Sequence, residues 1–539
     1  MHSMKRLASA ILIAFSAAGA AFATAAEAPA AAGALAPAYN LEADVTRVMK
    51  AFDVPGIAIA VVKDGKVVVA QGFGVRKLGD PAPVDGKTIF EIASNSKAFT
   101  AAGLAMLVDQ GKLEWDDPVI KHLPDFRMYD PYVTAEMTVR DLLTHRSGLG
   151  LGAGDLMWWP TTTFSTDEII HNLRYIRPAT SFRNSYAYDN LLYIVAGKII
   201  AMKSGKTWGE TMREWILDPV GMKTTTTSLD ELRNNPNVSA PHSRINGRIS
   251  VVKPMPVANA IGAVGINTSA EDIARWMNVL LDGGKLGKGE DGKETRLWSD
   301  KQAREMWTAQ TPMAINQPKP PLAATKPNFY AYGLGFQLRD YQGKLVALHG
   351  GALQGFYSRV LLVPEAKVGI AIFTNAESGP SLNALQYRLL DQYLGVAPTD
   401  WIGRIAEVDR ETQAKEKERL KTESATRAAQ SKPSLPLAAY EGEYKDPWYG
   451  SATIKRVGGK QVIAFSRTPD LTGEIEHFQH DTFVVRWKER NFNADAYMTF
   501  SLDHDGSIER MRMKPISTET DFSYDFQDLL FTPVKKKEK

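Results

Sequence analysis

Phe90-Glu-Ile-Ala-Ser-Asn-Ser-Lys-Ala-Phe-Thr100 places Ser94 and Lys97 three residues apart, at the start of a mostly apolar run that ends at Gln110. That run predicts a buried helix that begins near Lys97. Because positions i and i+3 lie on one face of a helix, the Lys97 amine can lie beside the Ser94 hydroxyl. The unpaired N–H groups of a helix N-terminus also favour an oxyanion. The stretch therefore predicts a serine nucleophile beside its base.

A serine and a lysine at this spacing can also be a simple helix cap followed by a solvated lysine. The chain contains a second match, Ser250-Val-Val-Lys253, which leads into Pro254. Proline biases the chain before it toward extended backbone, and a strand would not stack the serine and lysine as a helix turn does. We therefore expect chemistry at Ser94, where motifs further along the chain supply partners.

Tyr188-Asp-Asn190 lies directly before a second apolar helix, which we expect over residues 191–202. A phenol near a lysine ammonium ionises more easily, and it can relay a proton between the serine and the leaving group. Asn190 can donate a hydrogen bond to the substrate amide or to Lys97. Tyr188 and Asn190 are therefore the second pair of candidate site residues.

His349-Gly-Gly351 follows a strand that we expect over residues 344–348. Glycines at the edge of a site let a substrate backbone approach closely. The N–H of Ala352 can then pair with that of Ser94 as the two oxyanion donors. His349, Gly351 and Ala352 complete the set of candidates.

The order of these motifs resembles the serine β-lactamase and penicillin-binding-protein-like superfamily, in particular its class C β-lactamase, DD-peptidase and esterase branch. The resemblance covers roughly residues 38 to 395. Its three motif pairs are Ser94-x-x-Lys97, Tyr188-x-Asn190 and His349-x-Gly351. Five further segments look like recurrent stretches of that family: residues 90–100, 113–118, 138–149, 268–272 and 332–336.

The resemblance implies an acyl-enzyme mechanism with Ser94 as the nucleophile and Lys97 as its activating neighbour. Tyr188 would be the general base and acid, and Asn190 would orient Lys97 or the substrate. His349 would stand where the family has a lysine or a histidine, and steer the proton network. Whether Lys97 or Tyr188 takes the first proton stays open.

Two departures from the family pattern bear on the substrate. β-Lactamases usually carry Lys-Thr-Gly where this chain has His349-Gly-Gly351, and a neutral histidine holds the antibiotic's carboxylate less well. Asp189 replaces a usually small residue and adds a negative charge unless it points away. Both favour an esterase or a peptidase that acts on small or D-amino-acid peptides. A β-lactamase, a DD-carboxypeptidase and a catalytically idle peptidoglycan- or ligand-binding protein remain the alternatives.

Other kinds of site find little support in the sequence. The chain has no cysteine, so thiol nucleophiles, thiolate zinc sites and disulfides are excluded. His477 and His480 lack a third zinc ligand nearby, and we expect neither a metal nor a cofactor. Without a Gly-x-Ser-x-Gly elbow an α/β-hydrolase is not indicated. The resemblance places His145 in a structural turn rather than in a catalytic triad.

The N-terminus predicts export. Residues 1–26 have a short basic start, an apolar run and Ala-x-Ala sites, which is the pattern of a signal peptide, and residues 27–37 read as a flexible spacer. We expect a periplasmic or secreted protein with no stable membrane span after cleavage. The alternative interpretation is an uncleaved membrane anchor. A net charge of +3 with 23% charged residues gives no electrostatic case for a nucleic-acid partner. The expected partner is a small ester, peptide or β-lactam-like substrate; the oligomeric state is open.

The pattern along the chain predicts an α/β (α+β) fold in two domains. A helix over 40–52, a hairpin over 56–70 and strands at 345–348, 357–363 and 368–374 predict one antiparallel sheet assembled from both ends of a domain spanning 38–400, with a helical insertion between. The glycine-rich loop 148–154 suggests a mobile segment, and Trp158-Trp159 beside it is expected to be buried.

The last third of the chain changes character. Residues 401–436 are dense in Lys, Arg and Glu and predict a charged helical linker. Short alternating stretches from 437 to 539 predict an antiparallel β-barrel domain, which looks like the lipocalin-like module that often follows this hydrolase domain. A ligand calyx, a cap over the active site and an oligomerisation piece are all open as its role.

Overall fold

The computed structural model describes residues 39–289, 292–428 and 430–535. The predicted signal peptide (1–26) and the predicted spacer (27–37) therefore lie outside the described residues. Among the helices that are described, none is both long enough and apolar enough to cross a bilayer.

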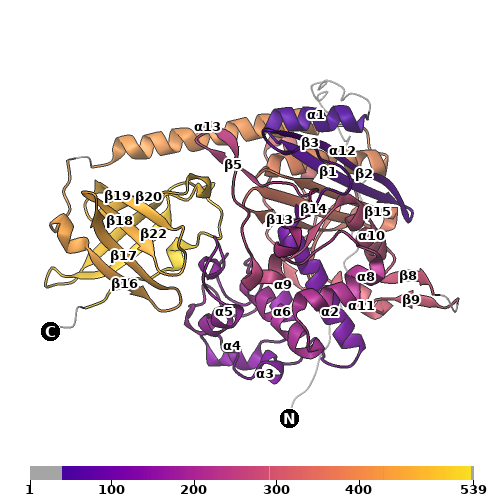
Figure 1. Ribbon diagram of the computed structural model, residues 1–539, viewed down its shortest axis with the longest axis horizontal. Coiled ribbons are helices and arrows are strands. Elements are labelled where there is room, and N and C mark those ends of the chain that lie inside the picture. The colour runs from indigo at the N-terminus through magenta and orange to yellow at the C-terminus, as the bar shows by residue number, and fades with distance from the viewer. Residues whose placement is uncertain (1–38, 290–291, 429, 536–539) are drawn as a thin grey trace, which may run out of the picture.

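A nine-stranded antiparallel sheet forms the frame of the larger domain (Figure 1). It is assembled from both ends of the domain, as the sequence predicts, because β1 pairs with both β2 and β15. In spatial order the strands are β10 (Thr311–Pro312), β11 (Tyr330–Tyr332), β12 (Gln337–Tyr341), β13 (Lys344–Leu353), β14 (Phe356–Val363), β15 (Val368–Thr374), β1 (Gly56–Lys63), β2 (Lys66–Lys77) and β3 (Asp80–Pro83).

The β1–β2 hairpin turns at Asp64 and Gly65, which both have positive φ, the geometry that two-residue hairpins prefer. Strand β1 is buried on both faces, so it reads as a continuous apolar run rather than an alternating one. Ile57 and Ile59 pack in the core beneath the helices α1 (Leu41–Phe52) and α12 (Gly379–Leu394). Ala58 and Ala60 face the core that contains the helical region.

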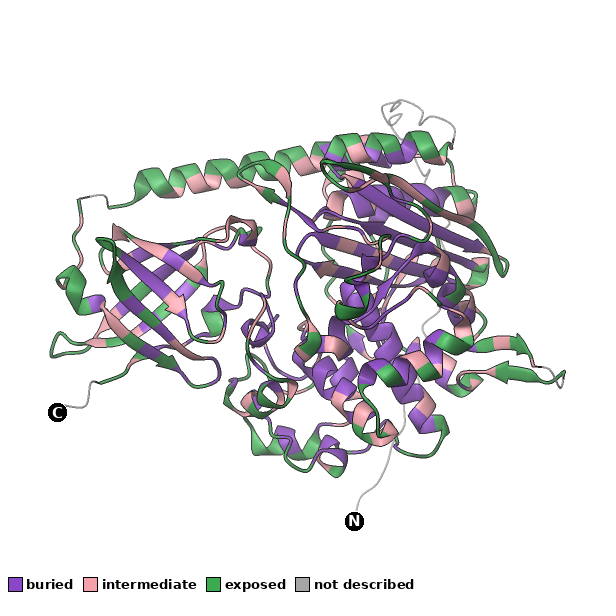
Figure 2. Ribbon diagram, in the orientation of Figure 1, coloured by how far each residue is buried: buried purple, intermediate pink, exposed green. Residues whose placement is uncertain are grey.

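The helical region is inserted between β3 and β10, as expected, and carries three small two-stranded sheets: β4 (Phe90–Glu91) with β7 (Asn267–Thr268), β5 (His242–Ile245) with β6 (Arg248–Val251), and β8 (Lys285–Lys288) with β9 (Glu294–Arg296). Its helices are α2 (Lys97–Asp109), α3 (Val119–His122), α4 (Pro131–Glu136), α5 (Thr166–Asn172), α6 (Leu191–Ser204), α7 (Trp208–Met212), α8 (Asp218–Val220), α9 (Ile261–Val264), α10 (Ala270–Leu281) and α11 (Asp300–Met306). Both α2 and α6 are apolar almost all round, and Figure 2 shows them among the buried elements.

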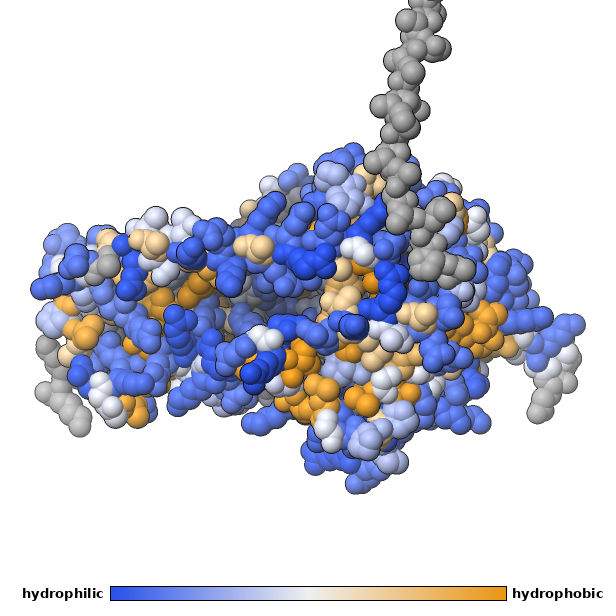
Figure 3. Space-filling view, turned by 90° about the horizontal axis from the view of Figure 1, so that it is seen from above, coloured by the Kyte–Doolittle hydropathy of each residue, from blue (hydrophilic) through white to orange (hydrophobic). Residues whose placement is uncertain are grey.

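The charged stretch after residue 400 forms one long helix, α13 (Trp401–Thr426), which runs from the larger domain toward the C-terminal sheet (Figure 1). Only its first turns are buried, where Trp401, Ile402 and Ile405 pack beneath the sheet of the larger domain. The rest is exposed, as Figure 2 shows, and the face seen in Figure 3 is predominantly hydrophilic. Its charged residues are mostly solvated, but Glu416 and Arg419 bond to Ser517 and Ile516 of the C-terminal domain.

The C-terminal residues form an eight-stranded antiparallel sheet that nearly closes into a barrel. Closure comes from Phe531, which bridges to Met511 of the strand at the other end of the sheet. The antiparallel pairing agrees with the β-barrel that the sequence predicts for residues 437–539. In spatial order the strands are β22 (Ile508–Pro515), β21 (Ala496–Leu502), β20 (Thr482–Trp487), β19 (Thr472–Gln479), β18 (Lys460–Phe465), β17 (Gly450–Val457), β16 (Gly442–Asp446) and β23 (Thr532–Pro533).

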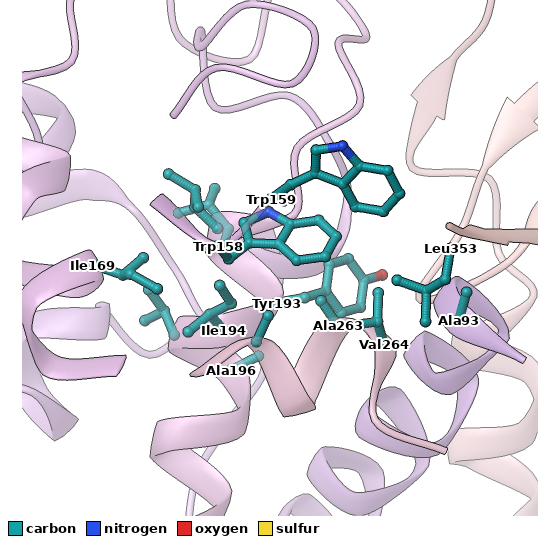
Figure 4. Close-up of a cluster of buried hydrophobic side chains, with 14 of the residues drawn as sticks. Ala93, Trp158, Trp159, Ile169, Tyr193, Ile194, Ala196, Ala263, Val264 and Leu353 are labelled. Atoms are coloured by element: carbon teal, nitrogen blue, oxygen red, sulfur yellow. The ribbon is translucent and has the colours of Figure 1, made fainter. Parts of the chain in front are cut away.

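The barrel packs directly against the helical region. Trp158 and Trp159 are buried as predicted, and Figure 4 shows them in one cluster with Tyr193, Ala93 and Leu353. On the barrel's side, the Tyr524 ring lies edge-on to Trp159 with the ring centroids 6.2 Å apart. The two domains therefore share a continuous apolar core.

The glycine-rich loop 148–154 is not the free segment that its composition suggested. Most of it is buried, and the Gly154 N–H donates to Asp525 of the C-terminal domain at 2.6 Å. A Cβ atom at Gly152 would lie 2.7 Å from the Phe522 ring and 2.9 Å from its carbonyl oxygen. Gly152 is therefore explained by the close approach of a second domain, whereas a Cβ atom at Gly148 or Gly154 would collide with residues of the larger domain itself.

Candidate active site

The candidate nucleophile lies on a sharp turn at the start of α2. Ala93 has a φ of 48°, a left-handed conformation that costs a non-glycine residue about 1 kcal/mol. A short 3₁₀ helix, η1 (Ala93–Ser96), follows and runs into α2. Backbone strain held in place by surrounding structure is typical of functional positions. Ser94 keeps 8% of its surface exposed at this turn.

Lys97 is fully buried and its amine makes three contacts. Nζ lies 2.9 Å from Ser94 Oγ, 2.8 Å from Asn190 Oδ1 and 3.3 Å from the carbonyl oxygen of Ala263. The predicted serine–lysine pair is thus in hydrogen-bond contact. The partners on Asn190 and Ala263 are oxygens that can only accept, so each takes a hydrogen from the amine.

Burial lowers the pKa of Lys97 to about 7, although the charges of Asp155 and Asp189 oppose that shift. A neutral amine has two hydrogens, and the acceptors on Asn190 and Ala263 hold both. Its lone pair is then left facing the Ser94 hydroxyl. The arrangement can therefore accept the serine proton near neutral pH.

Asn190 lies at the start of α6 and is buried. The sequence suggested that it donates to Lys97, but here Lys97 donates and the amide oxygen of Asn190 accepts. The amide nitrogen donates instead to Asp155 Oδ2 at 2.8 Å. Asn190 thus links the lysine to a buried carboxylate that the sequence analysis did not single out.

The Tyr188 hydroxyl lies near Ser94, and its ring lies under the Lys97 amine at 4.9 Å from Nζ to the ring centroid. The expectation that the lysine would ease its ionisation is wrong. Burial raises the pKa of the Tyr188 phenol well above its usual 10, and the nearby lysine does not offset that effect. The phenol is therefore protonated at neutral pH and can donate a proton.

His349 lies on β13, the strand that forms one edge of the site. Its Nε2 is 2.9 Å from the hydroxyl of Tyr332 and its Nδ1 is 2.5 Å from the carbonyl oxygen of Gly350. Since the carbonyl can only accept, Nδ1 carries the hydrogen and Nε2 accepts from the tyrosine. Burial and the Lys97 charge lower the pKa of His349 to about 3, so the ring is neutral.

The structure packs His349 near Tyr188, with ring centroids 6.0 Å apart, while its hydrogen bonds go to Tyr332 and Gly350. That His349 steers the proton network stays a prediction.

Gly351 lets β13 approach the nucleophile turn. A Cβ atom there would lie 2.1 Å from the carbonyl oxygen of Ile92 and 2.3 Å from Ser358 Oγ. Ser358 donates to that same carbonyl at 2.8 Å. Ala352 follows on the strand, paired with Tyr357. The role of the Ala352 N–H as an oxyanion donor stays a prediction.

The Asp189 carboxylate is hydrogen-bonded at the start of α6, and its charge raises the pKa of Lys97. Its carboxylate accepts from Ser147 Oγ at 3.2 Å and from the Leu192 N–H at 3.3 Å, so it caps α6. Burial raises its pKa to about 6. The Asp189 N–H donates to His145 Nδ1 at 3.1 Å.

His145 lies in a turn, with a φ of 53°, as the resemblance implied. Its ring packs on that of Tyr188, with centroids 4.3 Å apart, and burial lowers its pKa well below the usual range. The neutral His145 ring therefore packs against the Tyr188 ring.

Sequence reasoning missed Asp155, Tyr332 and a C-terminal pair, Phe522 and Ser523. Tyr332 lies in one of the recurrent segments, so a signal for it was present. Asp155 directly follows the glycine-rich loop 148–154, for which the sequence suggested mobility, and begins a short 3₁₀ helix. The Phe522 ring lies edge-on to Tyr188 with centroids 5.8 Å apart, and nothing in a separate β domain could have indicated that contact.

Neither a metal cluster nor a large cavity marks the site in the described part of the chain. It holds no group of three or more His, Cys, Asp or Glu side chains arranged to bind a metal ion. A cavity of about 740 Å³ lies beyond α9, where Trp208, Ile261 and Gly262 are among its lining residues. Ser94 does not line it, so hydrogen-bond geometry rather than cavity size identifies the site.

Comparison with protein families agrees with this geometry. Residues 41–394 match the family model described as Beta-lactamase, and residues 426–533 match one described as Domain of unknown function (DUF3471). A relative from Aspergillus campestris, Unguisins hydrolase ungD', is 30% identical over 486 residues, covering 86% of each chain. Protein flp of Staphylococcus aureus strain N315 is 25% identical over 338 residues, 60% of each chain.

Solved structures share the fold. The octameric penicillin-binding protein homologue from Pyrococcus abyssi superposes with a TM-score of 0.56 at 22% identity, covering 91% of this chain and 99% of that one. The D-amino acid amidase from Ochrobactrum anthropi SV3 gives a TM-score of 0.50 at 23% identity, covering 68% of this chain and 99% of that one. The first of these likenesses extends over nearly the whole length of this chain.

Proposed function

This chain belongs to the beta-lactamase family of serine hydrolases, which act through an acyl-enzyme, and on that premise we propose that it cleaves carboxylic esters or small peptides in preference to penicillins. The observation that carries the substrate preference is the neutral His349. With a pKa of about 3 it offers no positive charge to a substrate carboxylate. A lysine at this place would provide one.

Ser94, Lys97 and Tyr188 divide the chemistry in this proposal. Lys97 Nζ takes the hydroxyl proton as Ser94 Oγ attacks the substrate carbonyl carbon, and the carbonyl oxygen becomes the oxyanion. The protonated Tyr188 phenol gives its proton to the leaving group when the carbon–leaving-group bond breaks. The Lys97 ammonium restores that proton to the phenol. Water then attacks the acyl carbon and gives a proton to Lys97. The bond from that carbon to Ser94 Oγ breaks, the acid product leaves, and the Lys97 ammonium returns its proton to Ser94 Oγ.

Turnover is favoured over idle binding by the intact contacts of the site. The relative that matches both domains is itself named a hydrolase, which supports catalysis in this chain. The aromatic rings of Tyr188 and Phe522 offer apolar surface beside the nucleophile, which suits an uncharged acyl group.

A substrate panel tests the preference. We expect kcat/KM for p-nitrophenyl butyrate or D-alanyl-p-nitroanilide to exceed that for the penicillin-like reporter nitrocefin by at least about tenfold, since one charge-assisted hydrogen bond to the carboxylate is missing. The matched variant His349→Lys should move the ratio toward nitrocefin. Faster turnover of nitrocefin than of every ester and anilide would overturn the preference.

The pH dependence tests the assignment of the base. Because Lys97 has a pKa of about 7 and acts when neutral, the rate at which a fluorophosphonate labels Ser94 should rise through pH 7 and flatten above pH 8. Asp155 also titrates near 7, so Asp155→Ala is the control. Its midpoint should lie lower, because the Asp155 charge raises the pKa of Lys97. A rate that climbs steadily to pH 10 would contradict a lowered lysine pKa.

Export is part of the proposal as well, on the strength of the basic start, apolar run and Ala-x-Ala sites within residues 1–26. Mass spectrometry of the mature N-terminus from fractionated cells tests it: a cytoplasmic protein that retains Met1 would contradict export.

A further inference from the structure

The C-terminal domain makes three hydrogen bonds to one short stretch of the helical region, residues 154–156. Asp525 accepts hydrogen bonds from the N–H groups of Gly154 and Leu156, at 2.6 and 3.1 Å. Between these two residues lies Asp155, whose side chain accepts from Ser523 Oγ at 2.8 Å. Asp525 and Ser523 are both buried. Asp525 thus binds the backbone on either side of Asp155, and Ser523 binds the Asp155 carboxylate.

Asp155 connects these hydrogen bonds of the C-terminal domain to Lys97. Its Oδ2 accepts from Ser523 and from Asn190 Nδ2, each at 2.8 Å, while Oδ1 accepts from Trp158 Nε1 at 2.8 Å. The other end of the Asn190 amide accepts from Lys97 Nζ at 2.8 Å. An unbroken line of hydrogen bonds therefore runs from the C-terminal domain to the base of the reaction.

The direction of each bond in this line is determined by chemistry. The carboxylate of Asp155 accepts, so the amide of Asn190 must turn its nitrogen toward Asp155 and its oxygen toward Lys97. If the amide were reversed, its NH₂ group would face the lysine amine and compete for the lone pair that Ser94 needs. Asp155 is fully buried, so its carboxylate depends on its few donors.

We propose that Ser523 of the C-terminal domain is a positioning residue of the hydrolase active site, which acts through Asp155 and Asn190 to orient the Lys97 amine toward Ser94. The inference rests on the proposed function, because it assigns Ser523 to that reaction. Loss of the serine hydroxyl removes one of the two donors at Asp155 Oδ2 and frees the Asn190 amide to reorient. The C-terminal domain is then an integral part of the catalytic unit and not only a cap or a ligand calyx.

The neighbouring Phe522 supports the same conclusion independently of hydrogen bonding. Its ring meets the Tyr188 ring edge-on, and it packs over Gly152, whose N–H donates to the Tyr188 carbonyl oxygen at 2.9 Å. The same C-terminal segment therefore contacts the loop behind both Lys97 and Tyr188.

The experiment uses full-length protein and measures the second-order rate constant for labelling of Ser94 by a fluorophosphonate, together with kcat and KM on an ester. Ser523→Ala removes the hydroxyl, and Ser523→Cys keeps the shape while weakening the donor. Ser517→Ala is the matched control: it lies in the same segment, but its hydroxyl donates to Glu416 of α13 at 2.9 Å. Thermal unfolding of each variant checks that it is folded.

We expect both Ser523 variants to be labelled about tenfold more slowly, with the loss in kcat and little change in KM, as befits one hydrogen bond to a buried carboxylate. In the Asp155→Ala background, Ser523→Ala should have almost no further effect, because its path to Lys97 is gone. Ser517→Ala should be labelled like the wild type.

Wild-type labelling rates in the folded Ser523 variants would overturn the inference and leave the proposed function standing. Equal slowing by Ser517→Ala and Ser523→Ala would also overturn it, since general docking of the domain would then be the cause. No labelling of the wild type at Ser94 would overturn the proposed function and the inference together.

Discussion

Ser94→Ala is expected to lower kcat/KM for ester hydrolysis by at least about 10³-fold and to abolish fluorophosphonate labelling, because no other atom at the turn can form the acyl-enzyme. Among the described residues, Ser94 Oγ is the only hydroxyl oxygen hydrogen-bonded to Lys97 Nζ, at 2.9 Å, since the amine's other two partners are carbonyl-type oxygens. Peptide mapping of the labelled protein and steady-state kinetics measure both effects.

The neighbouring Ser96 is the matched control. It is fully buried, and its Oγ accepts the N–H of Ile266 at 2.9 Å. Ser96→Ala leaves that N–H unpaired, so we expect a loss of about 1–3 kcal/mol in the free energy of unfolding while labelling of Ser94 persists. Ser94→Ala should show the reverse, with activity lost and stability nearly unchanged. Retained labelling in Ser94→Ala would show that the nucleophile lies elsewhere.

Lys97→Met is expected to lower kcat by about 10³-fold, within the usual range for removal of a general base. Methionine has a similar length and suits the buried position, so the loss can be ascribed to the amine rather than to a cavity. Single-turnover acylation with an ester measures the step directly. The Ser94 hydroxyl remains in this variant but has no base in contact with it.

Lys97→Arg separates a proton acceptor from a mere positive charge. Arginine stays protonated and has no lone pair to offer, so we expect it to be as inactive as the methionine variant. If Lys97→Arg kept a tenth or more of the wild-type rate, the lysine would act by its charge, and Tyr188 would have to take the first proton. That outcome would conflict with the raised pKa of Tyr188.

The roles of Lys97 and Tyr188 show how burial changes an argument made from proximity. From sequence, a lysine near a tyrosine suggests an ionised phenol. In the folded protein the same burial disfavours the charged form of each group, so it lowers the pKa of Lys97 and raises that of Tyr188. In the proposed mechanism the amine is therefore the base and the phenol the acid.

Local sequence determined much of this protein. The apolar run after Lys97 predicted α2, and a Ser and a Lys at helical spacing met as expected because a helix fixes that distance without outside help. The strands on either side of the inserted helices were also predicted, since their apolar runs bury on both faces of the sheet. The order of the three motif pairs along the chain also indicated the family, because that order can be seen in the sequence alone.

Only the tertiary structure decided which residues of the site are joined by hydrogen bonds. The direction of the Asn190 amide follows from Asp155, and Asp155 is held by Ser523, which lies 368 residues away along the chain. The glycine-rich loop looked mobile because its sequence does not show the domain that packs on it. Spacing along a chain constrains neighbours within a helix or a strand. Desolvation, and contacts between a loop and a separate barrel, depend on which distant surfaces meet, and that is decided only when both domains have folded together.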